Sequence, residues 1–130
     1  MKTFMLAAAL LTLESLLPRI ASAADTPPGH YCNMGVFTAT SLKRHQELVV
    51  ELMSAMDGRR ELPNGYAFKF SGRFAAAGEW LDGVRRCCPT LDYQVDFERQ
   101  AGTAWLRVTG DAGAKEFIRN EFHQLVEKKI

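Results

Sequence analysis

Residues 61–70 read ELPNGYAFKF, and this stretch predicts the architecture of the chain. Its aromatic residues alternate from Tyr66 to Phe70, as expected for a strand that buries one face. The Pro-Asn-Gly segment at 63–65 accepts the positive φ angles of a tight turn. We therefore predict a β-hairpin in which residues 60–62 pair with the strand that begins at Tyr66.

A second hairpin is predicted further along the chain, where Tyr93, Val95 and Phe97 alternate and a run at 105–108 follows a turn at Gly102. Three helices are predicted from apolar residues that recur at steps of three and four. They are a helix from Thr38 to about Asp57-Gly58 with Leu42, Val49, Leu52, Met53 and Met56; a second with Phe74, Ala77, Trp80, Leu81, Val84 and Cys88; and a third with Phe117, Ile118, Phe122, Leu125 and Val126.

The elements follow the order α-ββα-ββα, and the two ββα units resemble one another. The segment FKFSG at 68–72 is echoed by LRVTG at 106–110. Hairpins and helices in this order bury their apolar faces best as two layers. We predict an α+β fold in which about four antiparallel strands form one sheet and three helices cover one of its faces.

The N-terminal residues 1–23 have the pattern of an export signal. Lys2 precedes the apolar run 4–13, and the small residues Ala21-Ser22-Ala23 form a cleavage site before Ala24. The apolar run is too short to span a bilayer, which needs about 20 apolar residues. We therefore predict a signal peptide and an exported protein, periplasmic or extracellular, with no stable membrane anchor after cleavage.

The mature chain is predicted to consist of an extended, proline-rich arm at 24–37 and a single α+β domain at 38–130. The whole chain has 47% hydrophobic and 24% charged residues, which is the composition of an ordinary globular protein. The whole chain has 16 Lys and Arg against 15 Asp and Glu, and removal of the leader leaves 14 of each. This neutral balance argues against a nucleic-acid partner.

Three segments carry a family resemblance: ELPNGYAFKF at 61–70, RRCCPTLDYQVDF at 85–97 and WLRVTGDAGAKEFI at 105–118. In them the chain resembles a group of small bacterial proteins of unestablished function that share ELPxGYxF, RxCCPxLxF and WLRLTGxxGxKxF motifs. The resemblance implies one compact domain and no particular activity. Members of this group often lack the export leader that this chain has.

The cysteines are the residues whose chemistry stands out. Cys87 and Cys88 are adjacent at the end of the predicted second helix, and Cys32 in the arm can reach them if the arm folds back. His30, Cys32 and Met34 alternate, so their side chains point the same way if the arm is extended. Thiolates and thioethers prefer soft ions. We predict that these five residues form a site for a soft metal or metalloid: Cu(I), Zn(II), Hg(II) or As(III).

A disulfide is the alternative interpretation of the same cysteines. In an oxidising compartment Cys32 can pair with Cys87 or with Cys88, closing a loop of about 55 residues and stabilising the fold by about 4 kcal/mol. A vicinal Cys87-Cys88 disulfide is also possible, although its eight-membered ring is strained. Because the number of cysteines is odd, one thiol is left over, either buried and inert or reactive.

The sequence contains no recognisable catalytic motif, and we expect a non-enzymatic protein. A thiol catalyst needs a lowered pKa, and here Arg85-Arg86 would lower the pKa of Cys87 while the helix C-terminus raises it. His45 and His123 lie on predicted helices, where histidines are ordinarily exposed or packed. The competing function is an interaction or small-ligand-binding module, with structural cysteines and an unknown protein or apolar ligand as its partner.

Overall fold

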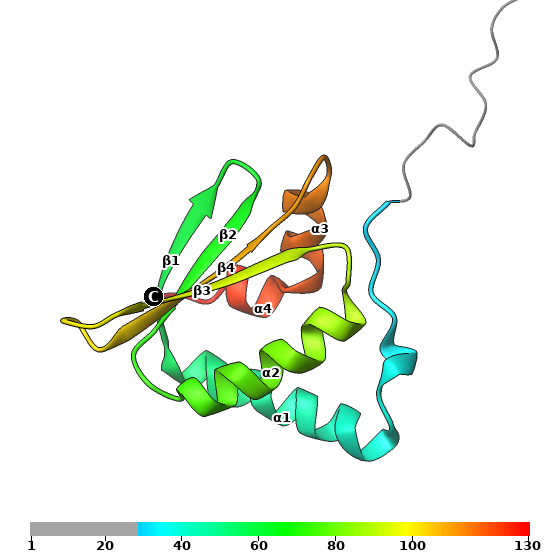
Figure 1. The fold of residues 1–130 in the computed structure, drawn as a ribbon, viewed down its shortest axis with the longest axis horizontal. Coiled ribbons are helices and arrows are strands. Elements are labelled where there is room, and N and C mark those ends of the chain that lie inside the picture. Colours follow the sequence, from blue (N-terminus) through cyan, green and yellow to red (C-terminus); the bar gives the residue numbers. More distant parts are fainter. Residues whose placement is uncertain (1–28) are drawn as a thin grey trace, which may run out of the picture.

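The computed structural model describes residues 29–130 and confirms the α+β fold (Figure 1). The predicted signal peptide and the first residues of the arm, 24–28, lie outside the described residues. The described elements are the 3₁₀ turn η2 (Met34–Val36), α1 (Ala39–Ala55), β1 (Met56–Leu62), β2 (Gly65–Phe70), α2 (Phe74–Cys87), β3 (Asp92–Glu98), β4 (Thr103–Thr109), α3 (Ala114–Glu121) and α4 (His123–Val126).

The four strands form one antiparallel sheet in the order β1-β2-β4-β3. Both predicted hairpins are present, as β1–β2 and β3–β4. They join side by side through β2 and β4, where Phe68 lies opposite Leu106 and Tyr66 opposite Val108. The outer edges of the sheet are therefore β1 and β3.

One face of the sheet carries most of the core. Tyr66, Phe68 and Phe70 on β2 are all buried on this face, as are Leu106 and Val108 on β4. The aromatic residues whose alternation predicted the first hairpin thus all lie on the core-facing side, although Ala67 on the other face is also buried.

The opposite face of the sheet is mostly polar, although Leu62, Ala67 and Trp105 also lie on it. It carries Arg60, Lys69, Asp96 and Arg107, and the guanidinium of Arg60 lies 4.8 Å from the ring centre of Trp105. An uncovered apolar face, which would have suited a docked partner, is therefore not found on this side of the described sheet.

The helices pack on the apolar face. Helices α1 and α2 lie against each other, and α3 contacts β2 and β4 (Figure 1). Within residues 29–130, none of the helices has the length and apolar character that crossing a membrane requires. The largest fully buried side chains are those of Trp80, Phe68, Phe70, Leu48, Leu52, Met56, Ile118, Val84 and Val108.

The predicted end of the first helix differs from the observed one. Helix α1 ends at Ala55, and β1 begins at the next residue, Met56, which pairs with Phe70. The register shifts between Met56 and Gly58, so that Asp57 forms an irregularity in the strand. Met56 is buried at the start of β1, and its apolar side chain fitted the helical pattern because burial in a helix and in a strand both call for an apolar residue. Its pairing with Phe70 places Met56 in β1 and not in a longer α1.

The predicted third helix is divided into two. Helix α3 ends at Glu121 and α4 begins at His123, while the N–H of Phe122 still bonds to the carbonyl of Ile118 at 2.8 Å. The ring of Phe122 meets Trp80 edge to face, with 5.7 Å between ring centres. This aromatic contact holds the α3–α4 junction against α2.

Replacing Leu52 with alanine should lower the free energy of unfolding by about 2–5 kcal/mol, because Leu52 on α1 is fully buried in the hydrophobic core. Urea denaturation followed by circular dichroism measures this loss. The matched control is Val50→Ala on the same helix, where the side chain is 71% exposed and the expected change is within about 0.5 kcal/mol. Equal losses in the two variants would contradict the assigned core.

Candidate functional site

Cys87 and Cys88 lie at the C-terminal end of α2. Cys87 is the last helical residue, and Cys88 caps the helix with its N–H bonded to the carbonyl of Val84 at 2.7 Å. Pro89 follows, and a proline this close to the end of a helix prevents its continuation. Both cysteine side chains are buried, with only 3% and 2% of their surface exposed.

The arm lies against this helix end. The N–H of Asn33 donates to the carbonyl of Cys87 at 2.7 Å, which satisfies one of the carbonyls that a helix leaves without a partner. Cys32, the preceding residue, forms a disulfide with Cys88. The sequence left open whether Cys32 would pair with Cys87 or Cys88, and the structure selects Cys88.

The remaining thiol completes a compact group of sulfur atoms. The Sγ atom of Cys87 lies 3.4 Å from that of Cys88 and 3.7 Å from the Sδ atom of Met34. The Sγ atoms of Cys32, Cys87 and Cys88 all lie within 4.8 Å of one another. The structure therefore brings together four of the five predicted ligands, which we call the sulfur cluster: Cys32, Met34, Cys87 and Cys88.

His30 is the predicted ligand that lies elsewhere. Its Nδ1 is 3.0 Å from the hydroxyl of Thr90, and its Nε2 is 2.8 Å from a carboxylate oxygen of Asp111. The ring also packs against Phe117, 5.6 Å away. With both ring nitrogens engaged, His30 fastens the arm near the N-terminus of α3. The expectation that His30 and Met34 share one side of the arm is therefore wrong, because Met34 begins the η2 turn.

The surroundings of Cys87 favour the neutral thiol. Burial is the larger cause that raises its pKa, and the nearby carboxylate of Glu121 raises it further. From the sequence, the charges of Arg85 and Arg86 were expected to lower the pKa of Cys87. In the structure, both guanidiniums instead pair with the exposed carboxylate of Asp82. The thiol of Cys87 is therefore protonated at neutral pH and a poor nucleophile.

A cavity of about 220 Å³ opens beside the sulfur cluster. Its apolar wall is formed by Val49, Trp80, Val84, Phe122 and Leu125. Four polar side chains also line it: His45 from α1, Glu121 from the end of α3, and His123 and Gln124 from α4. The cavity thus places the sulfur atoms beside an apolar wall.

The sequence interpretation gave His45 and His123 no role at this site. His45 stacks parallel to Trp80 with 6.2 Å between ring centres and packs against Phe37 at 4.7 Å. Burial, and then the charge of Arg86, lower its pKa, so the ring is neutral at pH 7. A usable signal was present, since His45 lies three and seven residues before the buried Leu48 and Leu52.

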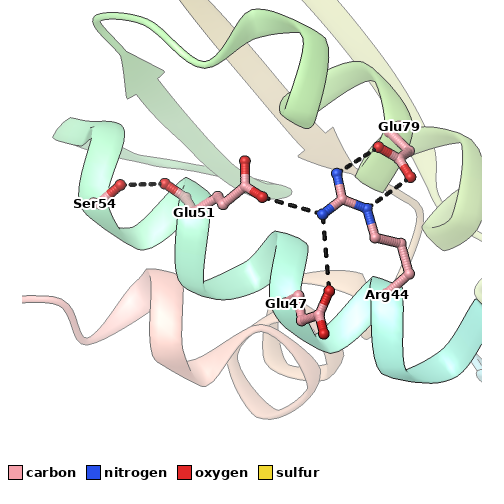
Figure 2. A network of polar contacts seen from close by, with 5 residues as sticks. All are labelled: Arg44, Glu47, Glu51, Ser54 and Glu79. Atoms are coloured by element: carbon pink, nitrogen blue, oxygen red, sulfur yellow. Dashed lines mark hydrogen bonds and ion pairs between the residues drawn. The ribbon is translucent and has the colours of Figure 1, made fainter.

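Helices α1 and α2 hold His45 and Cys87 relative to each other. They approach closely at Gly83, where an added Cβ would lie only 2.8 Å from Nδ1 of His45. On the solvent side, Arg44 of α1 bonds both carboxylate oxygens of Glu79 on α2, at 3.0 and 2.9 Å, and also contacts Glu47 and Glu51 (Figure 2). These groups are largely exposed, so they fix orientation more than they add stability.

Comparisons of the chain with protein-family models, curated proteins and solved structures found no match. The motif resemblance described from the sequence therefore stays a prediction.

The disulfide assignment predicts the thiol count of each variant. Oxidised protein should show one free thiol after denaturation, Cys87→Ala none and Cys32→Ser two, because only the latter opens the Cys32–Cys88 bond. Cys32→Ser should also lower the free energy of unfolding by about 2–4 kcal/mol. Thiol titration and urea denaturation measure both. Two free thiols in Cys87→Ala would contradict the Cys32–Cys88 assignment, because both alternative bonds, Cys32–Cys87 and Cys87–Cys88, involve Cys87.

Alkylation of Cys87 should depend steeply on pH. Because its pKa is raised, the rate with iodoacetamide should stay low at neutral pH and reach its midpoint at a higher pH than in urea-unfolded protein. Glu121→Gln should move that midpoint to lower pH by removing a negative charge, and mass spectrometry follows the reaction. Glu127→Gln, an exposed carboxylate outside the cavity, is the control. Identical profiles for the two variants would show that Glu121 does not act on the thiol.

Proposed function

We propose that the reduced protein binds a soft metal or metalloid ion through the thiolates of Cys32, Cys87 and Cys88. The observation that carries this proposal is the spread of their Sγ atoms, all within 4.8 Å of one another. Two sulfurs bound to one ion at about 2.3 Å lie at most about 4.6 Å apart, which is close to this spread. Thiolate is a soft ligand and selects soft, polarizable ions.

The anchors of the arm favour a site that persists after reduction. His30 and Asn33 hold the arm on either side of Cys32, through bonds to Thr90, Asp111 and the carbonyl of Cys87. None of these bonds involves sulfur. Opening the disulfide therefore leaves the Cys32 thiol beside the other two, as binding requires.

The ligand set favours ions that accept three sulfurs. Trivalent arsenic, Hg(II) and Cu(I) suit such a set, whereas zinc sites in proteins are almost always four-coordinate. Zinc would need a fourth ligand, and the candidate is His45, which lines the cavity from α1. The thioether of Met34, 3.7 Å from Cys87, adds a donor suited to Cu(I).

Binding should release protons, because the thiols must ionise to become ligands. The raised pKa of Cys87 means that its proton is still present at neutral pH. Affinity is therefore expected to increase as the pH rises toward the pKa of the thiol. The predicted signal peptide would bring this activity outside the cytoplasm.

The test is titration of phosphine-reduced protein with arsenite or Cu(I), read by native mass spectrometry under anaerobic conditions. One ion per chain is expected, and Cys87→Ser combined with Cys88→Ser should abolish binding while the circular dichroism spectrum persists. Met34→Leu should weaken Cu(I) binding without affecting arsenite, and Met53→Leu, remote from the sulfur cluster, is its control. Absence of any bound ion in reduced wild-type protein would overturn the proposal.

A second candidate function rests on different observations. The Cys32–Cys88 disulfide itself fits a purely structural role for the cysteines. An apolar groove of about 220 Å³ also lies between α2 and β3, where Phe74 meets the 68%-exposed Phe97 edge to face. These features support an interaction or small-ligand-binding module. That module is favoured if reduced protein binds no ion and loss of the disulfide changes stability alone.

A further inference from the structure

We propose that the preferred ligand of the sulfur cluster is a trivalent arsenical that carries one compact apolar substituent, such as a phenyl group. This inference rests on the proposed function and names its ligand class. Arsenic would bind Cys87 and Cys88, whose Sγ atoms are 3.4 Å apart, and the substituent would occupy the adjoining cavity.

The cavity has the size and the lining that such a substituent needs. A benzene molecule occupies an apolar cavity of about 150 Å³ in another protein, and the volume here is about 220 Å³. Val49, Trp80 and Leu125 give it an apolar wall directly beside the sulfurs. A bare ion would leave this apolar surface facing water, whereas a phenyl group would cover it.

The covalent step balances without a change in oxidation state. Two S–H bonds and the As=O bond of an arylarsenoso compound break, two As–S bonds form, and the oxygen leaves as water with both protons. Only two thiols are consumed, so Cys32 is not needed. The protein must first be reduced, since the Cys32–Cys88 disulfide otherwise leaves a single thiol. A phosphine reductant supplies the two electrons that open this disulfide and is removed before the titration.

The first test compares phenylarsine oxide with its methyl analogue on phosphine-reduced protein, by competition against a small dithiol. The small dithiol fixes the intrinsic preference of sulfur for the two arsenicals. The quantity compared is the affinity for the phenyl compound divided by the affinity for the methyl compound. Because the ring is buried in the cavity, this ratio should be about 10- to 100-fold larger for the protein than for the small dithiol. A protein ratio equal to the dithiol ratio would overturn the inference, although the proposed function would stand.

Matched variants test the cavity itself. Val49→Phe fills the space and should weaken phenylarsine oxide binding about tenfold or more while arsenite binding is unchanged. Val50→Phe, on the neighbouring and exposed position, should change neither. Cys32→Ser should retain phenylarsine oxide and weaken arsenite, which requires the third thiolate. Equal phenylarsine oxide affinity in Val49→Phe and wild type would refute the inference, whereas failure of wild type to bind either arsenical would refute the proposed function as well.

Discussion

The pairing of β2 with β4 is the interaction on which the rest of the structure depends. It joins two hairpins into one sheet and aligns their apolar residues on a single face, Phe68 opposite Leu106. Since each hairpin is followed by a helix, both following helices must then cover that same face. The end of α2 and the α3–α4 junction meet as a result, and the sulfur cluster with its cavity lies where they meet.

Much of this fold could be predicted from local signals. The Asn64-Gly65 turn, the alternating aromatics and the proline after Cys88 each act within a few residues, and the corresponding hairpin and helix end are present. The junction of α1 with β1 could not be placed from the sequence, because the apolar side chain of Met56 fits a buried position of a helix as well as one of a strand. Its pairing with Phe70 is a contact between residues far apart in the sequence, and the spacing of apolar residues gives no information about such contacts.

The residues of the sulfur cluster could be named from the sequence, but their geometry could not. Three cysteines and a methionine are conspicuous in the sequence, yet nothing in it distinguishes Cys87 from Cys88 as the partner of Cys32. The bond from Asn33 that places the arm at the helix end joins residues distant in sequence. His30 was expected among the ligands because alternation assumes an extended arm. Asp111 and Thr90, both distant in sequence, engage it instead. The cavity is formed by α1, α2 and the α3–α4 junction together, so no single segment could reveal it.

The two anchors of the arm have a kinetic consequence. Because His30 and Asn33 hold Cys32 in place without using sulfur, the Cys32 thiol has a high effective concentration at Cys88, far above that of any thiol free in solution. Under the proposed function, rapid reclosure of the disulfide would therefore compete with capture of an ion by the reduced sulfurs. In an oxidising environment, the fraction of sites that hold an ion would then depend on whether ion binding or oxidation of the thiols is faster.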